Sequence, residues 1–229
     1  MRILIVAATV HEIMPLGLVV RYAHHERPSL ALSQLTGERY HDVDILITGV
    51  GMVAAAARTA SVLARTRYRF VLNLGVCGSF DPSLAPGTVV HVVSDAIPEL
   101  GAEEGDGFLT IQELGLLEGD AAPFTGGRLT NASPPSNPAL QKLPAVRGIT
   151  VNTVHGNERS IADTVRRFDP QVESMEGAGF MYACLIHEAP FAQVRAVSNA
   201  VERRNRGAWR MDEAVAALCQ TATEVLDGA

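Results

Sequence analysis

Short runs of apolar, mostly β-branched residues alternate along the chain with segments of helical periodicity. The runs are Ile3–Ala7, Asp44–Thr48, Phe70–Leu74, Val89–Val93, Thr150–Val154 and Phe191–Val197. They carry almost no charge, and continuous apolar strands of this kind are covered on both faces. Apolar residues recur every three or four positions in the helical segments, which are roughly Val53–Arg65, Ser160–Arg167, Glu176–His187 and Met211–Leu226. The alternation predicts an α/β domain of three layers around a central, largely parallel sheet.

The chain length fits this reading. A chain of 229 residues can bury a full core without disulfide or metal staples, so we expect residues 1–229 to form a single domain. Between Ser94 and Pro138 Gly, Pro, Asp and Glu are frequent and periodicity is weak. We expect loops and short pieces of structure there, lying over the sheet.

Net charge and cysteine usage limit the classes of function that this chain can have. The net charge of -6, with no long Lys/Arg run, argues against nucleic-acid binding and favours a small-molecule partner. The three cysteines are odd in number and far apart, and no histidine spacing typical of zinc occurs, so we expect no disulfide framework, metal or cofactor. The first apolar run, about seven residues, is too short for a signal peptide or membrane span. We therefore expect a cytoplasmic protein that does not associate with membranes.

One glycine motif suggests a dinucleotide site. Gly49–Val50–Gly51–Met52–Val53–Ala54 follows an apolar strand and opens a helix, as in the GxGxxA turn. The acidic residue that would bind the ribose about twenty positions later is missing, and the motif does not follow the first strand. We interpret the glycines as a tight turn, and Ala54–Ala57 as a surface that lets the helix lie close to the sheet.

Polar or glycine residues follow the carboxyl ends of several expected strands, where open α/β sheets build ligand sites. These segments are Ala7–Ile13, Asn73–Phe80, Glu173–Gly179 and Arg195–Asn199. Each alone is weak evidence, because a glutamate at a helix start often complements the dipole and a loop glycine often permits a turn. Together they predict one site.

Four segments resemble a known family over nearly the whole length. They are Thr48–Gly51, Asn73–Ser79, Val172–Ala178 and Arg195–Asn199. The chain is similar to the purine and uridine nucleoside phosphorylase superfamily, in particular its hydrolytic branch of methylthioadenosine/adenosylhomocysteine nucleosidases and futalosine hydrolases. The resemblance implies a nucleoside phosphorylase-like α/β/α domain with a mixed, largely parallel sheet, and hydrolysis of an N-glycosidic bond without a cofactor. By analogy it also implies a homodimer.

The resemblance assigns roles to two carboxylates. Glu176 sits where the family binds the ribose hydroxyls, with Met175 beneath the sugar, and its charge suits an oxocarbenium-like transition state. The alternative for Glu176 is simple helix capping. Glu12 sits where the hydrolytic relatives hold the attacking water, which it would activate as general base, and Arg195 would touch the same water. An ordinary ion pair at a strand end remains the alternative for Arg195.

The pocket would be completed by smaller residues. By resemblance Val76 and Gly78 line the base and ribose pocket, and Val154 covers the purine face, unless it is a core strand residue. Cys77 is read as a packing residue, because nothing near it in the sequence would stabilise a thiolate. His155, which follows Val154 in the sequence, has no assigned role.

The last motif departs from the adenine-specific members, which end it in Ser-Asp. Here it reads Ser198–Asn199, and an amide can donate two hydrogen bonds to N7 and a 6-oxo group, which an ionised carboxylate cannot. Futalosine hydrolases show the same pair, followed by a polar stretch similar to Ala200–Arg206. The resemblance thus implies hydrolysis of futalosine to hypoxanthine and dehypoxanthinyl futalosine, in menaquinone biosynthesis. Arg203, Arg204 or Arg206 would then meet the carboxyphenyl group, or are simply solvated.

Three alternatives remain open. One is a methylthioadenosine/adenosylhomocysteine nucleosidase. Another is a purine nucleoside phosphorylase, although Glu12 in the first loop would repel the phosphate that this enzyme needs. The third is a non-catalytic binding or storage protein, against which the presence of both Glu12 and Glu176 argues.

Overall fold

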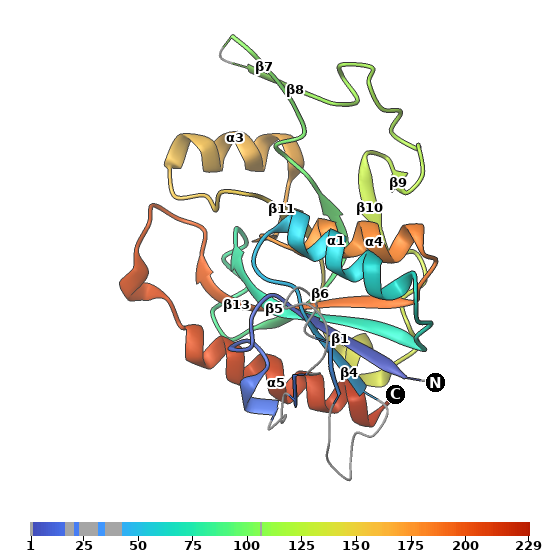
Figure 1. The fold of residues 1–229 in the computed structure, drawn as a ribbon. Coiled ribbons are helices and arrows are strands. Elements are labelled where there is room, and N and C mark those ends of the chain that lie inside the picture. Colours follow the sequence, from blue (N-terminus) through green and yellow to red (C-terminus); the bar gives the residue numbers. More distant parts are fainter. Residues whose placement is uncertain (1, 17–20, 23–31, 35–42, 106) are drawn as a thin grey trace.

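The computed structural model describes residues 2–16, 21–22, 32–34, 43–105 and 107–229, and Figure 1 shows its mixed sheet and surrounding helices. The strands are β1 Ile3–Ala7, β2 Arg21–Tyr22, β3 Leu32–Gln34, β4 Val43–Ile47, β5 Phe70–Ser79, β6 Val89–Ala96, β7 Gly101–Glu104, β8 Gly107–Thr110, β9 Phe124–Thr125, β10 Arg128–Thr130, β11 Ala145–Thr150, β12 Val172–Ser174 and β13 Phe191–Ala200. The helices are α1 Met52–Leu63, α2 Pro138–Lys142, α3 Glu158–Phe168, α4 Gly177–Ile186 and α5 Met211–Asp227, with 3-10 turns η1 Met14–Leu16 and η2 Arg206–Ala208.

The sheet is open at one end and closed on itself at the other. β1 lies between β4 and β5, and all three strands are parallel. Beyond β5 the pairing runs through β12, β11, β6 and β13 and returns to β5, so these strands form a ring. Within the ring, β5–β12 and β6–β13 are antiparallel, which makes the sheet mixed. Strand β5 therefore has neighbours on both edges at its carboxyl end, where the site is built.

Two apolar cores lie on opposite faces of the open end of the sheet. Along β1, Ile3, Ile5 and Ala7 belong to the core that contains the buried face of α5. The alternate residues Leu4 and Val6 belong to the core formed with α1 and α4. This alternation is what a strand buried on both faces requires. Figure 1 shows α1 and α4 on one side of the sheet and α5 on the other, which confirms the predicted three-layer α/β/α architecture.

The glycine turn before α1 is the tight turn expected from the sequence. Gly49 and Gly51 both have positive φ, 80° and 101°, and the helix begins at the next residue, Met52. Helix α4 lies close against this helix, since a Cβ on Gly179 would overlap the backbone oxygen of Met52. The small residues therefore bring the starts of both helices together.

One expected strand has different bounds in the structure, and the region expected to hold loops agrees with it. The strand expected at Thr150–Val154 is wrong in its bounds, because β11 ends at Thr150. Beyond it the backbone N–H of Asn152 donates to the carboxylate of Glu99 instead of to a neighbouring strand. The Ser94–Pro138 region holds short hairpins, β7–β8 and β9–β10, in agreement with the expectation of loops and short pieces.

Helix α2 was not expected. Its start carries a recognisable signal, because the side chain of Asn137 accepts hydrogen bonds from the backbone N–H groups of Ala139 and Leu140, and Pro138 takes the first helical position.

The described part of the chain holds neither a helix that could cross a membrane nor a cluster of side chains that could hold a metal ion. Within it, no helix is both long and apolar enough to cross a membrane. The same residues contain no group of three or more His, Cys, Asp or Glu side chains placed to hold a metal ion. Cys77, Cys184 and Cys219 are buried and free.

Candidate active site

Arg195 and Glu12 meet over a glycine of β5. Parallel pairing of β13 with β5 places Arg195 opposite Gly75. A Cβ on Gly75 would overlap Arg195 Nη1 and lie 3.1 Å from Glu12 Oε1, so only glycine leaves room for both side chains. Arg195 is 1% exposed, and its Nη2 donates to Asn73 Oδ1 at 2.7 Å. Among the described residues its Nε has no hydrogen-bond partner, which leaves a buried donor for a ligand.

Glu12 is held on the loop after β1. Its Oε2 accepts hydrogen bonds from the backbone N–H and the hydroxyl of Thr9, at 2.8 and 3.0 Å. Burial raises the pKa of Glu12 above its ordinary value; Arg195 and the Thr9 N–H oppose this shift, and the charge of Glu176 adds to it. A carboxylate with a raised pKa is a stronger base toward water, which is what a general base needs.

Glu176 approaches the same cluster from the start of α4. Its Oε1 accepts a hydrogen bond of 2.9 Å from the backbone N–H of Gly51, at the start of α1. Although Glu176 occupies the N-cap position of α4, its side chain makes no capping hydrogen bond. The structure thus gives this carboxylate a partner on another element, which weighs against simple capping. Its negative charge is also one of the causes that raise the pKa of Glu12.

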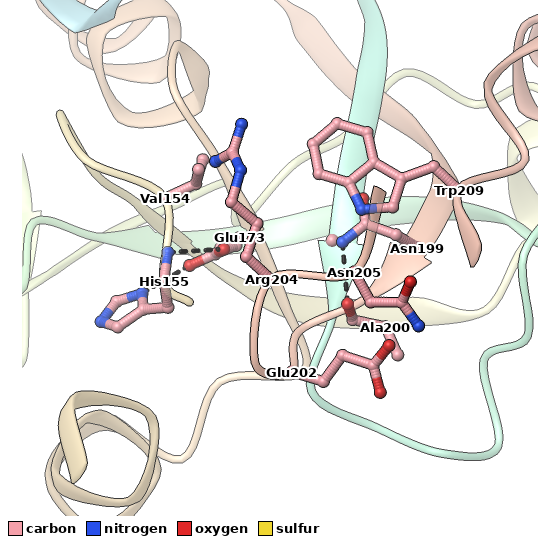
Figure 2. Close-up of a pocket in the computed structure, with 10 residues that line it drawn as sticks. Val154, His155, Glu173, Asn199, Ala200, Glu202, Arg204, Asn205 and Trp209 are labelled. Carbon is pink, nitrogen blue, oxygen red and sulfur yellow. Dashed lines mark hydrogen bonds and ion pairs between the residues drawn. The ribbon is translucent and has the colours of Figure 1, made fainter. Parts of the chain in front are cut away.

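A pocket lies further along β5 (Figure 2). Its lining residues are Gly78, Val154, His155, Glu173, Asn199, Ala200, Glu202, Arg204, Asn205 and Trp209. The amide of Asn199 has a defined orientation, since its Nδ2 donates to the carbonyl of Ala200 at 2.8 Å and its Oδ1 accepts from the Ser198 hydroxyl at 2.8 Å. A carbonyl only accepts, so Nδ2 must face it, and one N–H remains for another acceptor.

The two groups of residues follow one another along the strand. Arg195 and Asn199 lie opposite Gly75 and Gly78 of β5, which are three residues apart, or roughly 10 Å at the usual rise per residue. The charged cluster can therefore act at one part of a ligand while the pocket holds another part. An ionised base, a buried arginine and a second carboxylate suit the activation of water next to a developing positive charge.

The structure places the predicted residues in different ways. It brings Glu12, Arg195 and Glu176 together, and it puts Gly78, Val154 and Asn199 into one pocket. The two other predicted residues, Val76 and Met175, do not line this pocket. Val76 is partly buried and packs against the core beneath α5, and Met175, also partly buried, is not among the residues that line the pocket.

Sequence reasoning gave no role to Glu173 and His155, which share the pocket with Asn199. Glu173 is 4% exposed, and its carboxylate lies 2.6 Å from His155 Nδ1. A signal for Glu173 was present, since it begins the predicted site segment Glu173–Gly179 and a buried carboxylate needs a partner. Arg204, one of the three arginines considered for the carboxyphenyl group, lines the same pocket and lies over the ring of Trp209.

Cys77 fits its predicted packing role. It belongs to an apolar cluster inside the strand ring, and burial raises the pKa of its thiol to about 12. A thiol with so high a pKa supplies almost no thiolate near neutral pH, so Cys77 is not a nucleophile.

Comparisons with known proteins agree with this geometry. A family model described as the phosphorylase superfamily matches residues 2–228. The futalosine hydrolase of Streptomyces coelicolor is 36% identical over 204 residues, which cover 84% of this chain and 80% of that protein. A 5'-methylthioadenosine/S-adenosylhomocysteine nucleosidase of Colwellia psychrerythraea is 31% identical over 69% of this chain and 67% of its own. The solved futalosine hydrolase of Helicobacter pylori superposes with a TM-score of 0.80 at 16% identity, covering 100% of this chain and 98% of that one.

Proposed function

The chain belongs to the phosphorylase superfamily, and from this premise we propose that it hydrolyses futalosine to hypoxanthine and dehypoxanthinyl futalosine. The observation that carries the proposal is the fixed Asn199 amide, which keeps an N–H available in the pocket. With one N–H bonded to Ala200, one donor remains instead of the two expected, and it matches N7 or O6 of a 6-oxopurine such as hypoxanthine. The futalosine hydrolase relative is also more similar to this chain than the adenosine-type nucleosidase described above.

In this proposal Glu12 activates the water. Its Oε2 is tied to Thr9, and its Oε1 faces the Gly75 position beside Arg195, so the carboxylate is oriented before a ligand binds. Arg195 holds the water through its remaining donor and balances the charge of Glu12. Water then attacks the anomeric carbon, Glu12 takes its proton, and the bond to the base breaks with its electron pair leaving on the purine.

Glu176 holds the ribose in this mechanism. A carboxylate that accepts from the sugar hydroxyls interacts more strongly as positive charge develops on the ring, so it favours the transition state over the ground state. Met175 lies beneath the sugar, and Val76, Gly78 and Val154 complete the ribose and base subsites. No cofactor takes part in this reaction.

The adenine-releasing nucleosidases are the second candidate, because one of them is 31% identical to this chain. An adenine base presents a 6-amino donor toward the residue at position 199, and an amide whose NH2 faces that donor is a poor match. The position therefore favours a 6-oxopurine. A phosphorolytic reaction is disfavoured by Glu12, whose charge would repel a phosphate dianion at the place of the attacking water.

The proposal extends to the biological setting. Hydrolysis of futalosine belongs to menaquinone biosynthesis, and we place the enzyme in the cytoplasm, where it acts on a small-molecule substrate. We also propose a homodimer, by analogy with the oligomers common in this superfamily.

One experiment tests the reaction. The purified protein is incubated with futalosine and, separately, with methylthioadenosine, and the released base is identified by chromatography. Hypoxanthine from futalosine, with the rate unchanged between phosphate-free and phosphate-containing buffer, supports the proposal. Faster adenine release from methylthioadenosine would favour the second candidate, and a requirement for phosphate would favour a phosphorylase. Binding without release of any base would indicate a non-catalytic protein.

A further inference from the structure

The pocket in Figure 2 contains a second oriented polar group besides the Asn199 amide. The carboxylate of Glu173 accepts a hydrogen bond of 3.1 Å from the backbone N–H of His155 and lies 2.6 Å from His155 Nδ1. The imidazole is held in turn, because its Nε2 lies 2.9 Å from Thr164 Oγ1. An ionised carboxylate only accepts, so it pairs with the His155 tautomer that carries its proton on Nδ1. Glu173 is therefore a buried acceptor in a fixed position.

Glu173 and Asn199 converge on the same glycine from the two edges of β5. The antiparallel pairing with β12 sets Glu173 opposite Gly78, and the parallel pairing with β13 sets Asn199 opposite Gly78. A Cβ on Gly78 would overlap Val201 Cγ2, 2.8 Å away, and would lie 3.3 Å from Asn199 Nδ2 and 3.5 Å from Glu173 Cγ. The side chains of Asn199 and Glu173 therefore both lie next to Gly78, and both line the pocket in Figure 2.

This pair of groups matches the hydrogen-bonding edge of one class of purine. A 6-oxopurine presents acceptors at N7 and O6 and, next to them, a donor at N1–H. A 6-aminopurine has a donor at position 6 and an acceptor at N1, so the order at these two positions is reversed. An amide donor beside a carboxylate acceptor complements the first edge and opposes the second.

We propose that Glu173, positioned by His155, accepts the N1–H of a 6-oxopurine and determines base specificity together with Asn199. The inference rests on the proposed function, in which the substrate carries hypoxanthine. Each carboxylate oxygen of Glu173 takes one bond from His155 and retains capacity for another donor. A site built around such an acceptor rejects a base that presents an acceptor there, because two lone pairs would face each other.

The test compares two substrates that differ at the base edge, futalosine and 6-amino-6-deoxyfutalosine. In Glu173→Gln, an amide NH2 would oppose N1–H of hypoxanthine but could donate to N1 of adenine. We expect kcat/KM for futalosine to fall about tenfold to a hundredfold, with the preference moving toward the amino substrate. The matched control Glu103→Gln, on the exposed strand β7, should leave both values unchanged. An equal loss on both substrates would assign Glu173 a structural role and overturn the proposal.

A second measurement uses only the wild-type protein, so it does not depend on whether a variant folds. Product inhibition of the wild-type protein is compared for hypoxanthine and 1-methylhypoxanthine, in which a methyl group replaces the N1 hydrogen while O6, N7 and N3 are unchanged. We expect hypoxanthine to inhibit at concentrations at least about tenfold lower. Equal inhibition would overturn the contact with Glu173. If the wild-type protein released no hypoxanthine from futalosine, the proposed function itself would fail. Hydrolysis by wild type with an unchanged preference in Glu173→Gln would overturn only this inference.

Discussion

Among single residues, Glu12 carries the reaction in the proposed mechanism. In Glu12→Gln the amide keeps the size of the side chain and can still accept from Thr9, so the protein should fold. It cannot take a proton from water, and we expect turnover of futalosine to fall at least about a hundredfold. The measurement is kcat at saturating substrate, with circular dichroism to check folding. Near-normal turnover would remove Glu12 from this role.

The pH profile gives an independent check on Glu12. Its pKa is raised above the ordinary 4.5, chiefly by burial, and only the ionised form is a base. Activity should therefore rise with pH through this raised pKa, and the rise should occur above the pH at which an exposed glutamate ionises. The residual activity of Glu12→Gln should lack this acid limb. An acid limb that persists unchanged in the variant would belong to another group.

Glu176 offers a contrast between catalysis and stability. Glu176→Gln keeps an oxygen for the N–H of Gly51 but removes the charge that stabilises a cationic sugar. We expect kcat to fall at least about tenfold while the midpoint of thermal unfolding changes little. Both quantities are measured on the same preparation. A change in thermal stability alone would favour a structural role at the start of α4.

Asn199 determines the choice of base. Asn199→Asp replaces the NH2 group that now donates to the carbonyl of Ala200, and it sets a negative oxygen against O6 of hypoxanthine. An opposed buried polar contact costs about 1–3 kcal/mol, so kcat/KM for futalosine should fall roughly 5- to 150-fold. The preference should move toward 6-amino-6-deoxyfutalosine, because a carboxylate accepts from an amino group. An unchanged ratio of the kcat/KM values for the two substrates would mean that Asn199 does not contribute to base specificity.

At the level of elements, β5 brings the site together through its glycines. Gly75→Ala would push the new Cβ into the guanidinium of Arg195, which is fully buried and cannot retreat toward solvent. We expect loss of most of the activity and a lower unfolding free energy, measured by urea denaturation. Gly119→Ala is the control, because its Cβ would meet only ordinary contacts, beginning at 3.6 Å. A fully active Gly75→Ala protein would contradict the close packing described here.

The sequence predicted the elements that have a strong local signal. The continuous apolar runs and the helical periods identified β1, β4, β5, β6 and β13 and helices α1, α3, α4 and α5. The short strand β12 and the closure of the strand ring were not predicted, because pairing between distant segments leaves little local pattern. The same reason explains the site: Glu12, Arg195 and Asn199 lie in recognisable motifs, whereas the Glu173–His155 pair depends on contacts across the fold.

For the whole molecule, the buried Asp95 links stability to pH. Burial raises the pKa of Asp95 from 3.8 to about 6, although Gln193 and Thr150 donate to its carboxylate and Arg195 and Arg128 oppose the shift. The folded state then binds this proton more tightly than the unfolded state. The contribution of Asp95 to stability is therefore complete below pH 3.8 and is lost as pH rises through about 6. Its size is roughly 3 kcal/mol at most.

Asp95→Asn tests this linkage. The new amide can donate to Gln193 Oε1, which has no partner among the described residues, if the Gln193 side chain turns over. We expect the unfolding free energy of wild type minus variant to decrease between pH 4 and pH 7, as measured by urea denaturation at each pH. A difference that stays constant across this range would show that Asp95 titrates normally.

The most direct test of the central claim follows the oxygen atom that enters the sugar. The wild-type protein is incubated with futalosine in water enriched in oxygen-18, with phosphate present, and both products are analysed by mass spectrometry. Hydrolysis by activated water predicts unlabelled hypoxanthine and dehypoxanthinyl futalosine that carries one oxygen-18 atom. A phosphorylated sugar product, or intact futalosine after prolonged incubation with folded protein, would contradict the account.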